Sequence, residues 1–118
     1  MRRLFDTNIL IDVTRGHAEA IDLVRNSERA CISVVTRIEL LAGPDRDAAR
    51  IKAMMRRFDI IGIDDAIADA AAVIRRDARL KLPDAVILAT AQVRRLLLVT
   101  RNTKDFEGRD GVVIPYRL

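Results

Sequence analysis

The fold is decided by the stretch Arg2-Arg3-Leu4-Phe5-Asp6-Thr7-Asn8-Ile9-Leu10-Ile11-Asp12. Leu4 and Phe5 predict a short buried strand, and the apolar residues that follow at helical spacing predict a helix that begins near Thr7. A strand that ends at an acid and turns directly into a helix places that acid at the carboxyl edge of a sheet. Ligands bind at this edge in open α/β sheets, so Asp6 is the first candidate for a functional site.

The rest of the chain alternates between short apolar segments and helical patterns. Further strands are expected at residues 31–34, 60–63, 96–100 and 112–114, and helices at residues 7–16, 18–25, 35–42, 44–57, 64–78 and from 83 onward. Residues 84–91 are apolar on nearly every side, which predicts a buried helix. The alternation predicts one α/β domain over residues 1–118, in which helices flank a mostly parallel sheet of four or five strands in three layers.

Composition favours a water-soluble protein. Half of the 118 residues are hydrophobic and about a third are charged. No apolar run approaches the roughly 20 residues of a membrane-spanning helix. Polar residues at positions 6, 8 and 12 interrupt what would be the apolar part of a signal peptide, so we expect a cytoplasmic protein. The single cysteine, Cys31, excludes an internal disulfide and is expected to be a small buried hydrophobic residue.

The basic residues are mostly arginines. They number 18 of the 21, and the formal net charge is +4. Guanidinium forks match phosphate geometry, which favours a polyanionic partner such as nucleic acid. A genome whose base composition favours Arg and Ala codons is an alternative explanation. Because aromatic residues are scarce, recognition by base stacking on several aromatic platforms is not expected.

Two further acids occupy positions comparable to that of Asp6. Glu39 follows the second expected strand by one to two helical turns, and Asp84 opens the most apolar helix. Each acid alone has a structural explanation: Asp6 as a helix cap, Glu39 in a capping box with Thr36, and Asp84 as an acid favoured by the helix dipole. Together they predict three carboxylates at the same edge of a parallel sheet.

Carboxylates that crowd together are costly unless a cation compensates them. An all-oxygen site suits Mg²⁺ or Mn²⁺ rather than zinc. Such a site beside many arginines suggests phosphodiester hydrolysis, in which a metal activates water and stabilises charge on the phosphate.

Four segments resemble PIN domains, and most closely the VapC toxins of bacterial and archaeal toxin–antitoxin pairs. They are residues 4–12 (LFDTNILID), 33–43 (SVVTRIELLAG), 82–91 (LPDAVILATA) and 98–106 (LVTRNTKDF), in the order and spacing of that family. The resemblance implies a Mg²⁺- or Mn²⁺-dependent endoribonuclease of a type II toxin–antitoxin system. It also implies an RNA substrate, a cognate VapB-type antitoxin that covers the acidic site, a homodimer, and higher hetero-oligomers with the antitoxin.

The resemblance also assigns roles to residues. Asp6 and Asp84 are implied as direct metal ligands, and Glu39 as a ligand or a residue acting through water. Thr7 and Thr100 are implied to orient these ligands.

One position departs from the family pattern. Many PIN domains carry a fourth acid where this chain has Asn102. The amide can line the site and hold a water, and Asp105 is the nearby carboxylate, either a further metal ligand or a turn residue before Phe106. The missing charge puts a tightly held second metal in doubt.

Two other functions compete with the nuclease. A phosphoacceptor receiver domain needs an acid pair after its first strand and leaves Glu39 without a role. A non-catalytic RNA-binding or scaffold PIN domain would follow if Asn102 disables the site. Outside the site, His17 is expected in a solvated loop, and Asp12 lies six residues beyond Asp6 on a different helical face.

Overall fold

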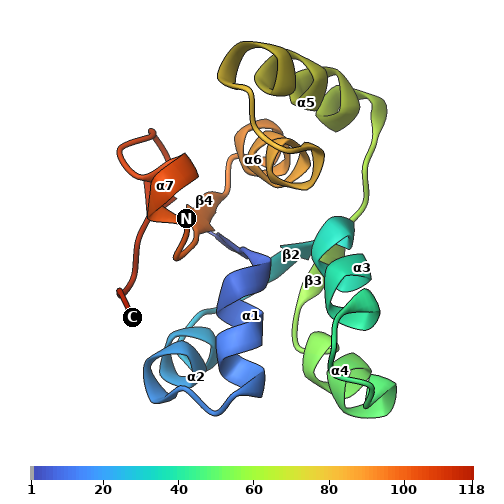
Figure 1. Cartoon of the computed structure of the whole chain (residues 1–118), viewed down its shortest axis with the longest axis vertical. Helices are drawn as coiled ribbons and strands as arrows, with labels where there is room; N and C mark the ends of the chain where they lie inside the picture. The colour runs from blue at the N-terminus through green and yellow to red at the C-terminus, as the bar shows by residue number, and fades with distance from the viewer. Residues whose placement is uncertain (1) are drawn as a thin grey trace.

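The computed structural model describes residues 2–118 and places five strands in one parallel sheet (Figure 1). The strands are β1 (Arg3–Phe5), β2 (Cys31–Ser33), β3 (Asp59–Ile61), β4 (Leu97–Val99) and β5 (Val112–Val113). Their order across the sheet is β3-β2-β1-β4-β5, and all four pairings are parallel. The predicted α/β architecture and parallel sheet are therefore confirmed.

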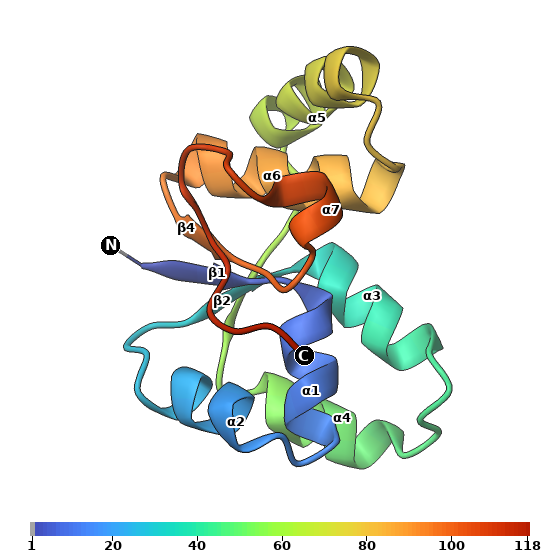
Figure 2. The ribbon, with the colours of Figure 1, turned by 60° about the vertical axis from the view of Figure 1, so that its left-hand side comes forward.

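Helices cover both faces of the sheet (Figure 2). They are α1 (Thr7–Thr14), α2 (Ala18–Arg25), α3 (Val34–Ala42), α4 (Ala48–Met55), α5 (Asp65–Ala78), α6 (Leu82–Arg94) and α7 (Thr103–Phe106). Helices α1, α2 and α4 lie on one side of the strands, and α5, α6 and α7 lie on the other. Within residues 2–118, no helix is both long enough and apolar enough to cross a bilayer.

Alternation along the strands creates a separate core on each face. Phe5 of β1 and its partner in register, Val99 of β4, pack with α1, α2 and α4. The preceding pair, Leu4 and Leu98, packs with α6 and with Phe106 of α7. This period of two is that of a strand buried on both faces. Helix α6 is buried at every position from 85 to 91, as its apolar sequence predicts.

The connections place a topological switch beside β1. The chain runs outward from β1 through β2 to β3, and then returns through α5 and α6 to the other side of β1, where β4 and β5 follow. The carboxyl ends of β1 and β4 therefore flank the crevice where open α/β sheets bind ligands. Asp6 directly follows β1, and Thr100 directly follows β4.

Two local features differ from the sequence-based expectation, and one helix was not expected. The helix expected from residue 44 begins only at Ala48, because Asp47 is its cap and accepts from the Arg50 amide. Ser33, rather than Thr36, caps α3 and accepts from the Val35 amide, so the proposed capping box does not form. The short helix α7 was not predicted.

Replacing Arg95 with glycine is expected to stabilise the protein. Arg95 ends α6 in the left-handed region, with φ of 55°. A residue with a Cβ atom is destabilised by about 1–2 kcal/mol in this region. Glycine avoids this cost but loses more conformational entropy on folding, so the free energy of unfolding should rise by about 0.5–1 kcal/mol. Urea unfolding measures it. Arg76→Gly, the same exchange inside α5, is the control and should destabilise by about 1 kcal/mol.

Candidate active site

Asp6 lies at the centre of a hydrogen-bonded network at the carboxyl end of β1. It is 4% exposed and caps α1 by accepting from the Thr7 amide at 2.8 Å. Its Oδ2 accepts from the Thr100 hydroxyl at 2.7 Å and from the Asn8 side-chain amide at 3.3 Å. The Asp6 side chain caps α1 and still lies at the predicted site. Its role as a helix cap is therefore compatible with a role as a metal ligand.

Glu39 reaches the same edge from α3. The Thr7 hydroxyl donates to Glu39 Oε1 at 2.7 Å and forms a second hydrogen bond of 3.0 Å with the Thr36 hydroxyl. Thr36 is fully buried and links α1 to α3, while Glu39 itself is exposed. Thr7 therefore fixes the position of the Glu39 carboxylate.

Asp84 sits in the first turn of α6 and is half-buried. Burial raises its pKa, repulsion from Asp105 and Glu39 raises it further, and Lys81 partly opposes both effects. The carboxylates of Asp105 and Glu39 thus act electrostatically on Asp84. These three side chains come from α7, α3 and α6.

Asn102 and Asp105 form a pair at the start of α7. Asn102 caps this helix, and its Oδ1 accepts from the Asp105 amide at 3.2 Å. Its side-chain amide donates to Asp105 Oδ2 at 3.0 Å. The Asn102 carbonyl oxygen is therefore engaged by backbone, and Asn102 orients the Asp105 carboxylate instead of replacing it.

The donor set fits a hard divalent cation. Asp6, Glu39, Asp84 and Asp105 offer only oxygen atoms, and within residues 2–118 none of them forms an ion pair with a basic side chain. Carboxylates without a cationic partner offer the oxygen ligands that Mg²⁺ and Mn²⁺ prefer. In the same part of the chain, no three His, Cys, Asp or Glu side chains lie close enough together to hold one ion as they stand.

The electrostatics of Asp6 predict how stability depends on pH when no metal is bound. Burial raises the pKa of Asp6 to about 6; hydrogen bonds from Thr100 and Thr7 oppose this shift, and repulsion from Asp84 and Glu39 adds to it. Between pH 4 and pH 6 the folded chain therefore binds this proton more tightly than the unfolded chain. The free energy of unfolding should fall by up to about 3 kcal/mol as the pH rises through this window.

Urea unfolding in chelator at pH 4, 5, 6 and 7 measures this decline. The Asp6→Asn variant, which has no titrating group at this position, should show a flatter profile. An equal decline in both proteins would show that other groups cause it.

A second polar cluster, which the sequence did not predict, connects α1 to the loop after β4 and to Tyr116. Asp12 is 2% exposed and accepts from Arg101 at 2.8 and 3.1 Å and from the Tyr116 hydroxyl at 2.7 Å. Burial raises the pKa of Asp12, but the hydrogen bonds from Arg101 and Tyr116 outweigh burial and hold the pKa below its ordinary value. No local pattern signals this pairing, because the partners are 89 and 104 residues apart.

His17 also differs from its prediction. It is not a solvated loop residue: it precedes α2, its ring packs against Tyr116 at 4.8 Å, and its Nε2 is buried. Cys31 is fully buried, as predicted.

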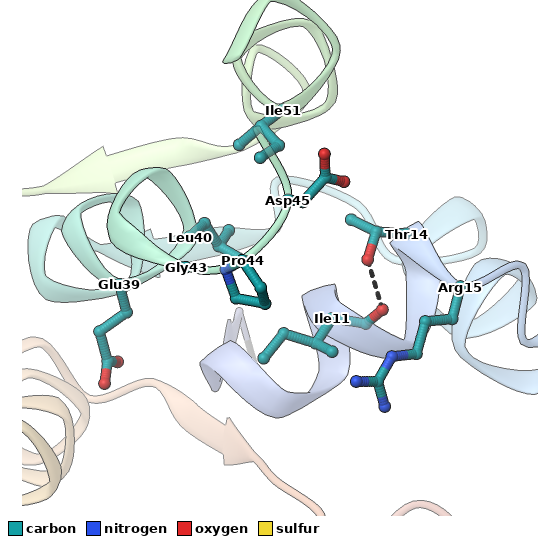
Figure 3. A pocket seen from close by; sticks show the side chains of 9 residues that line it. All are labelled: Ile11, Thr14, Arg15, Glu39, Leu40, Gly43, Pro44, Asp45 and Ile51. Atoms are coloured by element: carbon teal, nitrogen blue, oxygen red, sulfur yellow. Dashed lines mark hydrogen bonds between the residues drawn. The ribbon is translucent and has the colours of Figure 1, made fainter. Parts of the chain in front are cut away.

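An apolar cavity of about 300 Å³ adjoins Glu39 between α1, α3 and the start of α4 (Figure 3). Leu40, Ile11 and Ile51 form much of its wall, and Arg15 lies at its edge. The Thr14 hydroxyl beside it donates back to the Ile11 carbonyl oxygen at 2.6 Å. Glu39 borders the cavity from α3, and its carboxylate points away from the apolar side chains of the wall (Figure 3).

Comparison with known proteins identifies the family of the chain. A profile of the PIN domain family matches residues 3–111. The chain belongs to the PIN domain family. Its resemblance to PIN domains is therefore confirmed, and the relatives described next confirm the resemblance to VapC proteins.

Relatives of this PIN domain extend over nearly the whole chain. It is 32% identical to "tRNA(fMet)-specific endonuclease VapC" of Shigella flexneri, and the match covers 95% of each chain. A protein of the same name from Salmonella typhimurium is 30% identical over 97% of this chain and 96% of the relative. A solved toxin–antitoxin complex from Klebsiella pneumoniae contains a chain that is 44% identical, with a TM-score of 0.92 over 98% of this chain and 99% of that one.

Proposed function

We propose that this PIN domain is a metal-dependent endoribonuclease, the toxin of a VapBC-like type II toxin–antitoxin pair that acts in the cytoplasm. The observation that carries the proposal is the set of four unpaired carboxylates around the switch point, with Asp6 buried at its centre. The names of the two VapC relatives, each at least 30% identical, support the same activity.

Each residue has a distinct role in this proposal. Asp6 and Asp84 bind Mg²⁺ or Mn²⁺ directly, and Glu39 binds it directly or through a water. Thr7 holds Glu39, and Thr100 holds Asp6. A bound ion would supply an activated water and would neutralise charge on the scissile phosphate.

Asp105 supplies the fourth carboxylate of the proposed site. After burial, repulsion from Asp105 is the largest cause that raises the pKa of Asp84, and the Asn102 amide fixes the orientation of Asp105. Asn102 is thus a positioning residue. This arrangement keeps a carboxylate beside Asp84 although position 102 carries an amide, which supports catalysis over a disabled scaffold.

We propose transfer RNA as the substrate class, because both curated relatives are named for cleavage of a tRNA. The excess of arginines supports binding to a polyanion through its phosphates.

The proposed partners are a VapB-type antitoxin and a second copy of the chain. The Klebsiella pneumoniae relative is described as part of a toxin–antitoxin complex, and the apolar cavity beside Glu39 offers a surface for an antitoxin segment that covers the acids. Exposed apolar side chains support self-association: Ile38 is 60% exposed, Leu82 is 57% and Ile63 is 48%. Sedimentation of the purified chain tests the dimer, and loss of cleavage on adding the antitoxin tests that partner.

The central test is cleavage of RNA by the purified chain free of antitoxin. Unmodified transfer RNA, ribosomal RNA and a single-stranded RNA are each incubated with Mg²⁺, with Mn²⁺ and with chelator. Cleavage that requires metal and selects transfer RNA is the expected result, and mapped ends identify the cut site. Binding of RNA without cleavage, by a folded and metal-loaded protein, would support the alternative of a non-catalytic RNA-binding PIN domain.

A further inference from the structure

The ion pair between buried Asp12 and part-exposed Arg101 joins the end of α1 to the loop after β4. Arg101 donates from Nε and Nη2 to the two carboxylate oxygens of Asp12, and the Tyr116 hydroxyl donates a third hydrogen bond to the same carboxylate. The terminal segment that carries Tyr116 runs back across the molecule to α1 (Figure 2). Buried ion pairs contribute little net stability compared with apolar packing, so their placement calls for a further explanation.

Arg101 is also held through its backbone. Its N–H donates to Asn8 Oδ1 at 3.0 Å, so the side chain and the backbone of one residue are both fixed to α1. The Asn8 amide in turn donates to the Thr100 hydroxyl oxygen at 3.1 Å. The two contacts lock the loop after β4 onto the helix that follows Asp6.

The Thr100 hydroxyl has one proton and two acceptor positions. Its oxygen accepts from the Asn8 amide at 3.1 Å and from the Asn102 backbone N–H at 3.0 Å. With both acceptor positions used, the proton must point to Asp6 Oδ2, at 2.7 Å. Donation from Thr100 to Asp6 therefore requires that the backbone of residues 100–102 keeps its position beside Asn8.

We propose that Asp12 is a positioning residue of the acidic site, whose ion pair with Arg101 fixes the loop after β4 so that Thr100 donates to Asp6. The proposal rests on the nuclease function above. The same loop carries Asn102, which orients Asp105, so the pair aligns the two sides of the site together. Asp12 lies outside the acidic site itself and acts only through this loop.

The decisive variant is Asp12→Asn in the full chain. It keeps the size of the side chain and an acceptor for Tyr116, but it removes the charge that holds Arg101. Amide exchange at Arg101 and Asn102 should become about tenfold faster or more. The kcat for RNA cleavage should fall by about ten- to a hundredfold with KM nearly unchanged, as for other residues that orient metal ligands.

A double variant separates positioning from general stability. In a Thr100→Val background the bond to Asp6 is already lost, so adding Asp12→Asn should lower kcat clearly less than it does in the wild-type background, and the remaining loss acts through Asn102 and Asp105. Val24→Ala, a truncation on α2, is the control and should leave kcat and exchange at Arg101 unchanged in the folded protein. An Asp12→Asn loss of the same size in both backgrounds, or unchanged amide exchange in the single variant, would overturn the proposal.

The amide-exchange measurement does not need nuclease activity, so failure of the nuclease function and failure of the positioning role are distinguishable. If Asp12→Asn does not fold, Arg101→Gln breaks the same ion pair at its part-exposed partner. It should accelerate exchange at the amides of residues 101 and 102 as well, and unchanged exchange there would contradict the proposal.

Discussion

Asp6→Asn is expected to abolish RNA cleavage while making the metal-free protein more stable. Asp6 is a charged metal ligand in the proposed function, and its loss would remove stabilisation worth several kcal/mol, which corresponds to a fall on the order of 10³-fold in kcat. The same change removes a buried charge whose pKa is raised to about 6, so the fold no longer carries this cost at pH 7.5. We expect a gain of about 1–2 kcal/mol in the free energy of unfolding, because the new amide group partly conflicts with the donors around it.

Cleavage assays with Mg²⁺ and urea unfolding in chelator measure the two effects. Asp22→Asn, at an exposed carboxylate of α2, is the matched control and should change neither quantity appreciably. A stable, inactive Asp6→Asn protein is the signature of a functional residue that is strained in the resting fold. A variant that is both inactive and less stable would instead assign Asp6 a mainly structural role.

Phe106→Ala is expected to cost about 3–5 kcal/mol of stability and to impair cleavage as well. Phe106 is fully buried and is the only buried side chain of α7. It packs with Leu4, Leu88 and Leu98 in the core between the sheet and α6. Removing its ring opens a cavity and releases the helix that carries Asp105.

Thermal unfolding gives the loss of stability, and cleavage at a temperature where the variant remains folded gives the loss of activity. Leu96→Ala truncates another residue of the same core but leaves α7 intact. We expect the Phe106 variant to lose about tenfold more activity than the Leu96 variant at equal folded fraction. Equal activity of the two folded variants would show that α7 does not need its anchor for catalysis.

The parts of the fold that follow from local patterns could be predicted from the sequence. Leu4 and Phe5 were recognisable as a buried strand, and the apolar run after Asp84 as a buried helix, because burial on all sides leaves few polar residues. The parallel edge then brings the carboxyl ends of neighbouring strands together, which is why Asp6, Glu39 and Asp84 could be grouped. Their assignment as metal ligands remains a prediction.

Features that depend on long-range contacts were not predictable in this way. Thr36 fits the pattern of a capping residue, yet it is buried against Thr7, and Ser33 takes the cap because the helix begins directly at the end of β2. Asp12 was separated from the acids by helical spacing, but nothing near it in sequence indicates its partner Arg101. Asn102 was considered for its chemistry, and its role as the cap of α7 depends on a helix too short to give a periodic signal.

The sheet order has a consequence for the timing of assembly during synthesis. β1, which is made first, pairs along its full length with β4, and the Thr100 hydroxyl reaches Asp6 across 94 residues of chain. A nascent chain that has not yet released its last fifth from the ribosome contains Asp6, Glu39 and Asp84 but lacks the strand and loop that align them. The candidate site therefore cannot be aligned until β4 and the loop after it have left the ribosome.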